Sequence, residues 1–266
     1  MQTLLSFIFP PRCPVCDGLR YPWENVCCPE CRRKLRELGE SVCFRCGRPT
    51  EETEEYCISC RKRMPCFERG FSAFRYEGAA RESVLGFKFL EREANGAFYA
   101  GELLRLHGAA LRGFAAEAVV PVPIHRRKLR QRGYNQAQVL ARALADGLRL
   151  PCEPRLLVRT RYTAPQKELN AAERLKNLNG AFAISRRFRR KKRRMPESVL
   201  LVDDILTTGS TLEACARVLK SGGVRRVAVV TVCSAGNSEA AEAQVLNSSA
   251  AAPPAAGRGG SRFPPA

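Results

Sequence analysis

Two different hydrophobic periods alternate along residues 67–236. Short runs rich in Val, Phe and Ala predict strands, and longer stretches with an apolar residue at every third or fourth position predict helices. The expected strands are 70–76, 118–122, 156–158, 181–184, 198–202 and 224–232, and the expected helices are 79–90, 97–112, 135–150 and 211–221. Strands that alternate with helices indicate the α/β class, with a parallel sheet and crossover helices.

The stretch 198–211 (SVLLVDDILTTGST) carries the strongest local pattern. Its continuous apolar run predicts a central strand that is buried on both faces. We expect this strand to end at Asp203 and Asp204, and a short loop to lead from there into the next helix. Ligands of open α/β sheets bind at the carboxyl ends of strands, and anions bind at helix N-termini. The pattern therefore predicts an anion site.

The residue types of this loop suit a phosphate. Gly209 lets the backbone approach a ligand closely, and hydroxyl donors surround it at Thr207, Thr208, Ser210 and Thr211. The two carboxylates would repel a phosphate, so they suit sugar hydroxyls or a magnesium ion. The alternative is that the acids cap a turn and the Thr-Gly-Ser run only begins a helix. A buried strand, a double acid and a hydroxyl-rich loop in succession favour the binding site.

The rest of the chain divides into zones of different composition. Residues 1–66 are rich in Cys, Pro and Arg, and residues 67–236 carry the α/β pattern. Residues 237–266 are dominated by Ala, Pro, Gly and Ser, which cannot build a core, so we expect a disordered tail. The polar stretch 160–180 predicts a long loop with some helix.

Eight of the thirteen cysteines fall into four C-x-x-C pairs, all within the first zone. Two such pairs complete a tetrahedral Cys₄ zinc site. We favour successive pairing, which predicts two structural zinc sites, one from Cys13, Cys16, Cys28 and Cys31 and one from Cys43, Cys46, Cys57 and Cys60. A cross-braced arrangement stays open, and Cys27 is an alternative to Cys28. Redox pairs are a further alternative, but four pairs in fifty residues favour metal.

The cellular compartment determines whether the cysteine thiols stay reduced. Residues 1–11 are apolar but lack a basic region and a small-residue cleavage site, so they predict a packing segment and not a signal peptide. No apolar run reaches the roughly 20 residues that span a bilayer. We therefore expect a cytoplasmic protein with reduced thiols, with peripheral binding at the inner membrane face as an alternative.

The formal net charge is +19, which attracts polyanions such as nucleic acid, anionic membrane or phosphate-rich ligands. The charge is concentrated in residues 186–194 (RRFRRKKRR) and in a second cluster formed by Arg126, Arg127, Lys128, Arg130 and Arg132. Runs of like charge are also common in solvated loops, so this alternative stays open.

Residues 199–211 resemble the phosphoribosyl pyrophosphate motif of type I phosphoribosyltransferases. The resemblance implies that Asp203 and Asp204 contact the ribose hydroxyls, that Thr207–Thr211 wrap the 5′-phosphate, and that Mg²⁺ accompanies the pyrophosphate. It also implies a pyrophosphate loop after the strand at 118–122, with Pro123, His125, Arg126 and Lys128. For His125 a turn-stabilising role is an equal alternative. The resemblance also gives Lys88 as a candidate to reach such a site, but a helix-surface lysine is the simpler interpretation.

Four segments in order, 66–89, 121–137, 163–182 and 200–211, resemble the ComF family of bacterial competence-associated proteins. The resemblance covers about residues 7–234 and implies a double zinc ribbon followed by a phosphoribosyltransferase-like domain. It implies a part in DNA uptake, with single-stranded DNA and DNA-uptake proteins as partners. Two functions follow as hypotheses: a phosphoribosyltransferase of unknown acceptor, or a non-catalytic DNA-binding protein that uses the phosphoribosyl site as a sensor.

Overall fold

The computed structural model describes residues 10–21, 26–90, 92–162, 178, 180–190 and 194–236. The expected tail at 237–266, most of the apolar start and most of the loop at 160–180 lie outside the described residues. Within the described part, no helix is both long enough and apolar enough to cross a membrane.

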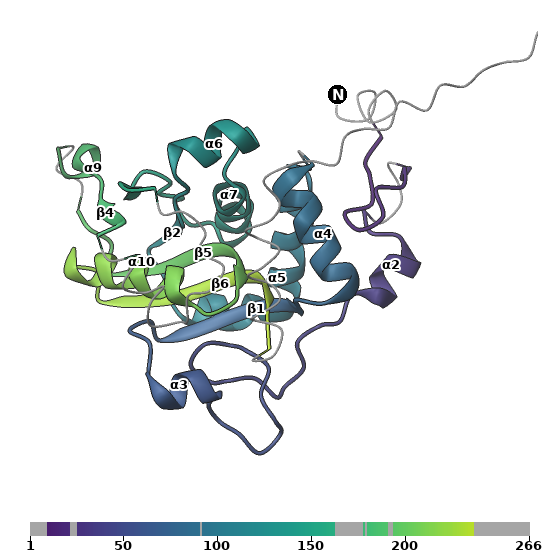
Figure 1. Cartoon of the computed structure of the whole chain (residues 1–266), viewed down its shortest axis with the longest axis horizontal. Coiled ribbons are helices and arrows are strands. Elements are labelled where there is room, and N and C mark those ends of the chain that lie inside the picture. The colour runs from purple at the N-terminus through teal and green to yellow at the C-terminus, as the bar shows by residue number, and fades with distance from the viewer. Residues whose placement is uncertain are drawn as a thin grey trace, which may run out of the picture.

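A four-stranded parallel sheet forms the centre of the molecule (Figure 1). Its strands are β1 (Arg69–Arg75), β2 (Ala118–Pro121), β5 (Ser198–Leu206) and β6 (Arg226–Ser234), in the spatial order β1-β6-β5-β2. All neighbours pair in parallel, which confirms the predicted fold class. β5 is longer than predicted, because it continues through both aspartates to Leu206. The acids therefore lie within the strand and not after it.

Helices cover both faces of the sheet, as the continuous apolar run of β5 requires. On one face α4 (Gly78–Phe89), α5 (Asn95–Gly113) and α7 (Gln136–Leu148) form a core with Leu200 and Val202. On the other face α10 (Ser210–Ser221) packs against Val199 and Leu201. Successive side chains of a strand point to opposite faces, so β5 contributes to both cores.

Two short strands form a second, separate sheet. β3 (Leu157–Arg159) and β4 (Phe182–Ile184) pair with each other in antiparallel fashion. Both strands were expected, at 156–158 and 181–184, but their antiparallel pairing was not. An antiparallel pair needs no crossover helix between its strands, which suits such short segments.

Both basic clusters contain short helices. α6 (Arg126–Arg132) begins after β2, and α9 (Arg186–Arg190) follows β4. Phe188 of α9 is buried, so this run is anchored by one apolar side chain in a row of arginines. The run at 186–190 is therefore a packed helix and not only a solvated loop.

The cysteine-rich zone forms two separate modules (Figure 1). The first ribbon (residues 10–39) contains α2 (Pro29–Lys34) and lies beside α4. The second ribbon (residues 40–66) contains α3 (Ile58–Lys62) and lies next to β1. Residues 36–38 of the first ribbon also bond to β1, so both modules meet the α/β domain at this strand and the first meets α4 as well.

Candidate functional site

The cysteines gather into two tetrads. Within each tetrad the Sγ atoms lie within 4.8 Å of one another, and the members are Cys13, Cys16, Cys28 and Cys31 in one and Cys43, Cys46, Cys57 and Cys60 in the other. Four thiolates bound tetrahedrally to zinc at about 2.3 Å would show comparable separations. The arrangement is successive and not cross-braced, and both tetrads fit structural zinc.

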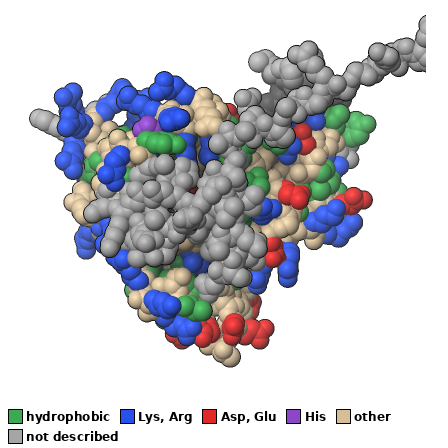
Figure 2. All heavy atoms as spheres, in the orientation of Figure 1, with side chains coloured by type: hydrophobic (Ala, Val, Ile, Leu, Met, Phe, Trp, Pro, Cys, Tyr) green, Lys and Arg blue, Asp and Glu red, His purple; other side chains and the backbone are tan. Residues whose placement is uncertain are grey.

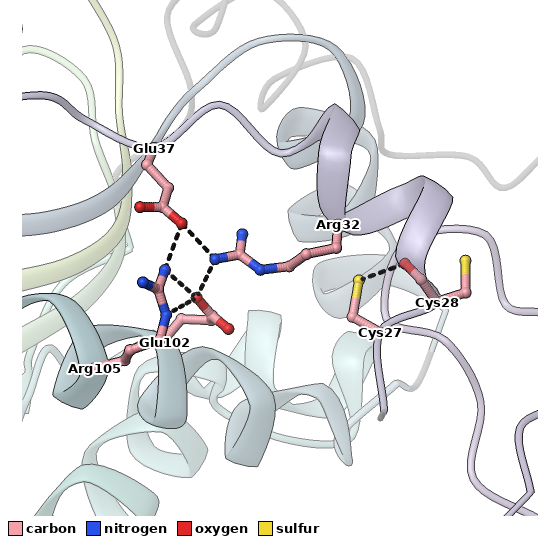
Figure 3. Close-up of polar contacts among 6 residues, drawn as sticks. All are labelled: Cys27, Cys28, Arg32, Glu37, Glu102 and Arg105. Carbon is pink, nitrogen blue, oxygen red and sulfur yellow. Dashed lines mark hydrogen bonds and ion pairs between the residues drawn. The ribbon is translucent and has the colours of Figure 1, made fainter. Parts of the chain in front are cut away.

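Cys28, and not Cys27, belongs to the first tetrad. The Cys28 Sγ lies 3.8 Å from that of Cys13, whereas the Cys27 Sγ contacts the backbone oxygen of Cys28 at 3.7 Å. Figure 3 shows the two side chains pointing in different directions. Burial raises the pKa of the Cys27 thiol to about 12, which keeps it protonated at neutral pH.

A partly exposed ionic cluster attaches the first ribbon to α5 (Figure 3). Arg32 and Arg105 both pair with Glu102, at 3.0 and 2.8 Å, and both also pair with Glu37. Burial by itself would raise the pKa of Glu37, but the hydrogen bonds from the two guanidinium groups outweigh it and hold the pKa below its ordinary value. Glu37 therefore stays ionised at neutral pH.

The acidic pair lies on β5 beside a buried lysine. The Lys88 Nζ, at the end of α4, is 3.1 Å from the Asp204 Oδ2, and the Lys88 side chain is only 6% exposed. The Asp203 carboxylate accepts the backbone N–H of Asp204 at 2.9 Å. The simpler interpretation of Lys88 as a helix-surface residue was therefore wrong.

Burial and like charges shift several pKa values here. Burial, with the negative charge of Asp204, raises the pKa of Asp203 to about 7, although Lys88 and Arg159 act in the opposite direction. Burial and the neighbouring cations lower the pKa of Lys128 to about 8. A metal ion or a hydrogen-bond donor beside Asp203 would stabilise its ionised form. An anion beside Lys128 would stabilise its protonated form.

A cavity of about 140 Å³ joins these groups at the carboxyl ends of β2 and β5. Its lining includes both acids, four cations and the first turn of α10. The residues concerned are Asp203, Asp204, Lys88, Lys128, Arg132, Arg159, Pro123 and Thr211. The cavity therefore contains both the acidic pair and part of the expected pyrophosphate loop.

The expected phosphate loop forms the turn between β5 and α10. Gly209 is the N-cap of α10 with a φ of 77°, in the left-handed region that favours glycine. Gly209 has no side-chain oxygen that could cap the first N–H groups of α10. The N–H groups at a helix N-terminus bind anions. The hydroxyls of Thr208 and Ser210 lie 3.0 Å apart at this turn.

His125 and Arg126 line a different space. The His125 Nδ1 accepts the backbone N–H of Arg127 at 3.2 Å and so caps α6, which is the turn-stabilising alternative. Both residues border a groove of about 990 Å³ between α6, the paired strands β3 and β4, and α9. Of the four expected pyrophosphate-loop residues, only Pro123 and Lys128 reach the smaller cavity.

Sequence reasoning missed two arginines of the site. Arg159 ends β3 and lines both the cavity and the groove. The only sequence feature that pointed to Arg159 was a basic residue at the end of an expected strand. Arg48, in the second ribbon, donates to the backbone oxygen of Thr207 in the phosphate loop. Nothing in the local pattern around Arg48 indicates this contact.

Fold and site together define the class: a phosphoribosyltransferase-type α/β domain that carries two cysteine ribbons. The phosphoribosyl transferase domain family matches residues 131–248, and the double zinc ribbon domain family matches residues 4–61. These matches agree with the sheet domain and with the tetrads.

Relatives that match most of this chain identify the family within that class. Competence protein F of Haemophilus influenzae is 29% identical over 226 residues, which is 82% of this chain and 94% of the relative. DNA utilization protein YhgH of Salmonella typhimurium is 30% identical over 77% of this chain and 89% of the relative. Competence protein ComFC of Bacillus subtilis is 28% identical over 76% of this chain and 80% of the relative. The chain belongs to the ComF family.

Proposed function

We propose that this chain binds phosphoribosyl pyrophosphate with Mg²⁺ and transfers the phosphoribosyl group to an acceptor. The observation that carries the proposal is the cavity that joins Asp203 and Asp204 to four cations at the start of α10. Thr207–Thr211 would bind the 5′-phosphate, and the two aspartates would accept hydrogen bonds from the ribose hydroxyls. Mg²⁺ takes oxygen ligands, and carboxylate and pyrophosphate oxygens are of this kind.

The charges around the cavity suit the chemistry of that transfer. The bond between the anomeric carbon and the pyrophosphate oxygen breaks as the bond to the acceptor forms. Lys128, Arg132 and Arg159 would stabilise the charge that collects on the departing pyrophosphate. The two carboxylates would stabilise the positive charge that develops on the sugar ring, because preorganised charges act strongly in a buried site.

The names of the relatives indicate a biological process in which this chain could act. Competence protein F, Competence protein ComFC and DNA utilization protein YhgH point to the uptake and use of DNA. We infer that this chain acts in the same setting, in the cytoplasm or at the inner face of the membrane, with DNA-uptake proteins as partners.

A second candidate is a single-stranded DNA-binding protein that uses the phosphoribosyl site as a sensor. The 990 Å³ groove supports it, because an apolar floor is bordered by Arg126, Arg186, Arg187 and Arg189. Lys and Arg side chains gather over α6 and α9 at the upper left of Figure 2. Cationic grooves of this kind bind the backbone of single strands.

The first test is calorimetric titration of the zinc-loaded chain with phosphoribosyl pyrophosphate and Mg²⁺. We expect binding by the wild type and a loss of at least about 100-fold in the Asp203→Asn/Asp204→Asn variant, since charged hydrogen bonds are the stronger ones. An Asp146→Asn variant on the exposed side of α7 is the control and should bind normally. A folded wild type that does not bind this ligand would exclude the transferase proposal.

The DNA-binding candidate predicts a salt-dependent affinity for single strands. Arg186→Ala/Arg189→Ala should reduce the slope of log K against log salt by about 1.4, at about 0.7 per lost phosphate contact. Arg112→Ala/Arg142→Ala removes the same charge from exposed positions on α5 and α7. Fluorescence anisotropy with a labelled oligonucleotide measures both slopes. Equal slopes in the two variants would show that the groove does not bind DNA.

A further inference from the structure

Arg48 occupies an unusual position for a charged residue. It follows the Cys43–Cys46 knuckle of the second ribbon, and only 4% of its surface is exposed. Its backbone oxygen accepts the N–H of Cys43 at 2.7 Å, which closes the knuckle. A buried guanidinium is costly unless its donors find partners, so the contacts of this side chain decide its role.

The second knuckle of the same tetrad holds the arginine from the ribbon side. The Arg48 Nη1 lies 3.4 Å from the hydroxyl oxygen of Ser59, to which it donates. Ser59 stands between Cys57 and Cys60. The arginine is therefore fixed by both cysteine pairs of the tetrad, one through the backbone and one through a side chain.

The other end of the guanidinium holds the phosphate loop. The Arg48 Nη2 donates to the backbone oxygen of Thr207, the first residue of that loop. The same nitrogen would lie 3.7 Å from a Cβ built on Gly209. Fixing the Thr207 carbonyl constrains the peptide plane, and so constrains where the following N–H groups of the loop point.

A second contact ties the ribbon to the first turn of α10. The Glu213 Oε2 accepts the backbone N–H of Cys66 at 2.9 Å, and the Glu213 N–H donates to Gly209 O at 2.8 Å. Glu213 is itself buried. The phosphate loop is thus braced by the second ribbon at both of its ends.

The first ribbon makes none of these contacts among the described residues. Its Pro14 oxygen accepts hydrogen bonds from Ser83 at 2.5 Å and from Asn95 at 3.3 Å, on α4 and α5. The two ribbons are alike in cysteine content but differ in what they support.

We propose that Arg48 is a positioning residue of the phosphate loop, through which the folded second ribbon sets the affinity for the phosphate ligand. The inference rests on the proposed phosphoribosyl pyrophosphate site and deepens it. Metal binding orders a cysteine ribbon, so loss of metal from the second tetrad would release Arg48 and with it Thr207. Loss of metal from the first tetrad would leave the loop in place.

The test compares Arg48→Ala with Arg45→Ala. Arg45 is an arginine of the same ribbon that also donates to a backbone oxygen, that of Pro65 at 2.9 Å, but it does not contact the loop. Affinity for phosphoribosyl pyrophosphate with Mg²⁺ is measured by calorimetry, and amide exchange of the peptide that covers residues 207–211 is measured by mass spectrometry. Zinc content and thermal midpoint are recorded for each variant.

We expect Arg48→Ala to lower the affinity by about 10-fold or more and to speed exchange at 207–211, since an orphaned carbonyl is costly. Arg48→Lys should restore part of both, and Arg45→Ala should change neither. A folded Arg48→Ala protein with wild-type affinity and exchange would overturn the proposal. If the wild type binds no phosphoribosyl pyrophosphate, the ligand assignment fails, while the exchange data still decide whether Arg48 positions the loop.

A second variant covers the case in which Arg48→Ala does not fold. Ser59→Ala keeps all four cysteines and removes only the ribbon-side partner of Arg48. We expect a smaller loss of affinity, about threefold, with faster exchange at 207–211, in keeping with one lost hydrogen bond. Unchanged affinity and exchange in a folded Ser59→Ala protein would overturn the proposal.

Discussion

Burial of the Asp203 carboxyl group strengthens its binding of a proton. Its pKa rises to about 7, because burial and the charge of Asp204 disfavour ionisation. The folded chain therefore binds this proton more tightly than the unfolded chain, in which the pKa is near 4. From this group alone, the free energy of unfolding must fall as pH rises from about 4 to about 7.

Asp203→Asn removes this dependence. We expect the variant to be more stable than the wild type at pH 8, where the wild type holds a buried charge, and the difference to shrink at pH 5.5. Urea unfolding of the ligand-free protein at the two pH values measures it, with exposed Asp146→Asn as the control. A difference that is equal at both pH values would contradict the raised pKa.

At the residue scale, the sequence alone predicts a site only where the residues that would form it are consecutive. Asp203, Asp204 and Thr207–Thr211 stand side by side in the sequence, and their types alone indicate an anion site. Lys88, Arg159 and Arg48 could not be assigned in this way, because they meet the site from distant segments. Only the folded chain reveals that Lys88 is buried against Asp204.

At the scale of elements, close backbone packing joins the second ribbon to β1. A Cβ on Gly70 would lie 2.0 Å from the Cys46 oxygen, and a Cβ on Gly47 would lie 2.4 Å from the Gly70 oxygen. Two backbones approach here without side chains between them. Any side chain at Gly70 must push the ribbon away from the sheet.

Gly70→Ala should therefore destabilise the chain by roughly 2 kcal/mol or more, as overpacking against backbone does. Gly101→Ala is the matched substitution in the exposed interior of α5, where a new Cβ meets nothing within 4 Å. It should stabilise by about 0.5–1 kcal/mol. Thermal and urea unfolding of both variants measure the difference. Similar effects in the two variants would refute the close contact.

The elements of the α/β domain could be predicted because each carries an apolar period that tertiary packing then uses. α6 and α9 were not predicted, since their positions are nearly all basic and give no apolar period. The antiparallel pairing of β3 with β4 also escaped prediction. Strands of three residues hold too little pattern to specify a partner.

At the scale of the whole molecule, two closed thiolate sites attach to one sheet domain. Metal analysis should find about two zinc ions per chain, because each Cys₄ tetrad completes one tetrahedral site. Cys31→Ser and Cys60→Ser should each lose one, and Cys66→Ser, outside both tetrads, should retain both. A zinc content unaffected by Cys31→Ser or Cys60→Ser would contradict the tetrads.

The strand order β1-β6-β5-β2 has a consequence for synthesis on the ribosome. β1 leaves the exit tunnel early, yet its partner in the sheet is β6, the last of these strands to be translated. Residues 36–38 bond to one edge of β1, but within this sheet β1 pairs with no strand other than β6, so its second edge stays unpaired until residue 234 has emerged. During that interval the exposed apolar strand needs shielding, and chaperones that bind emerging chains are suited to provide it.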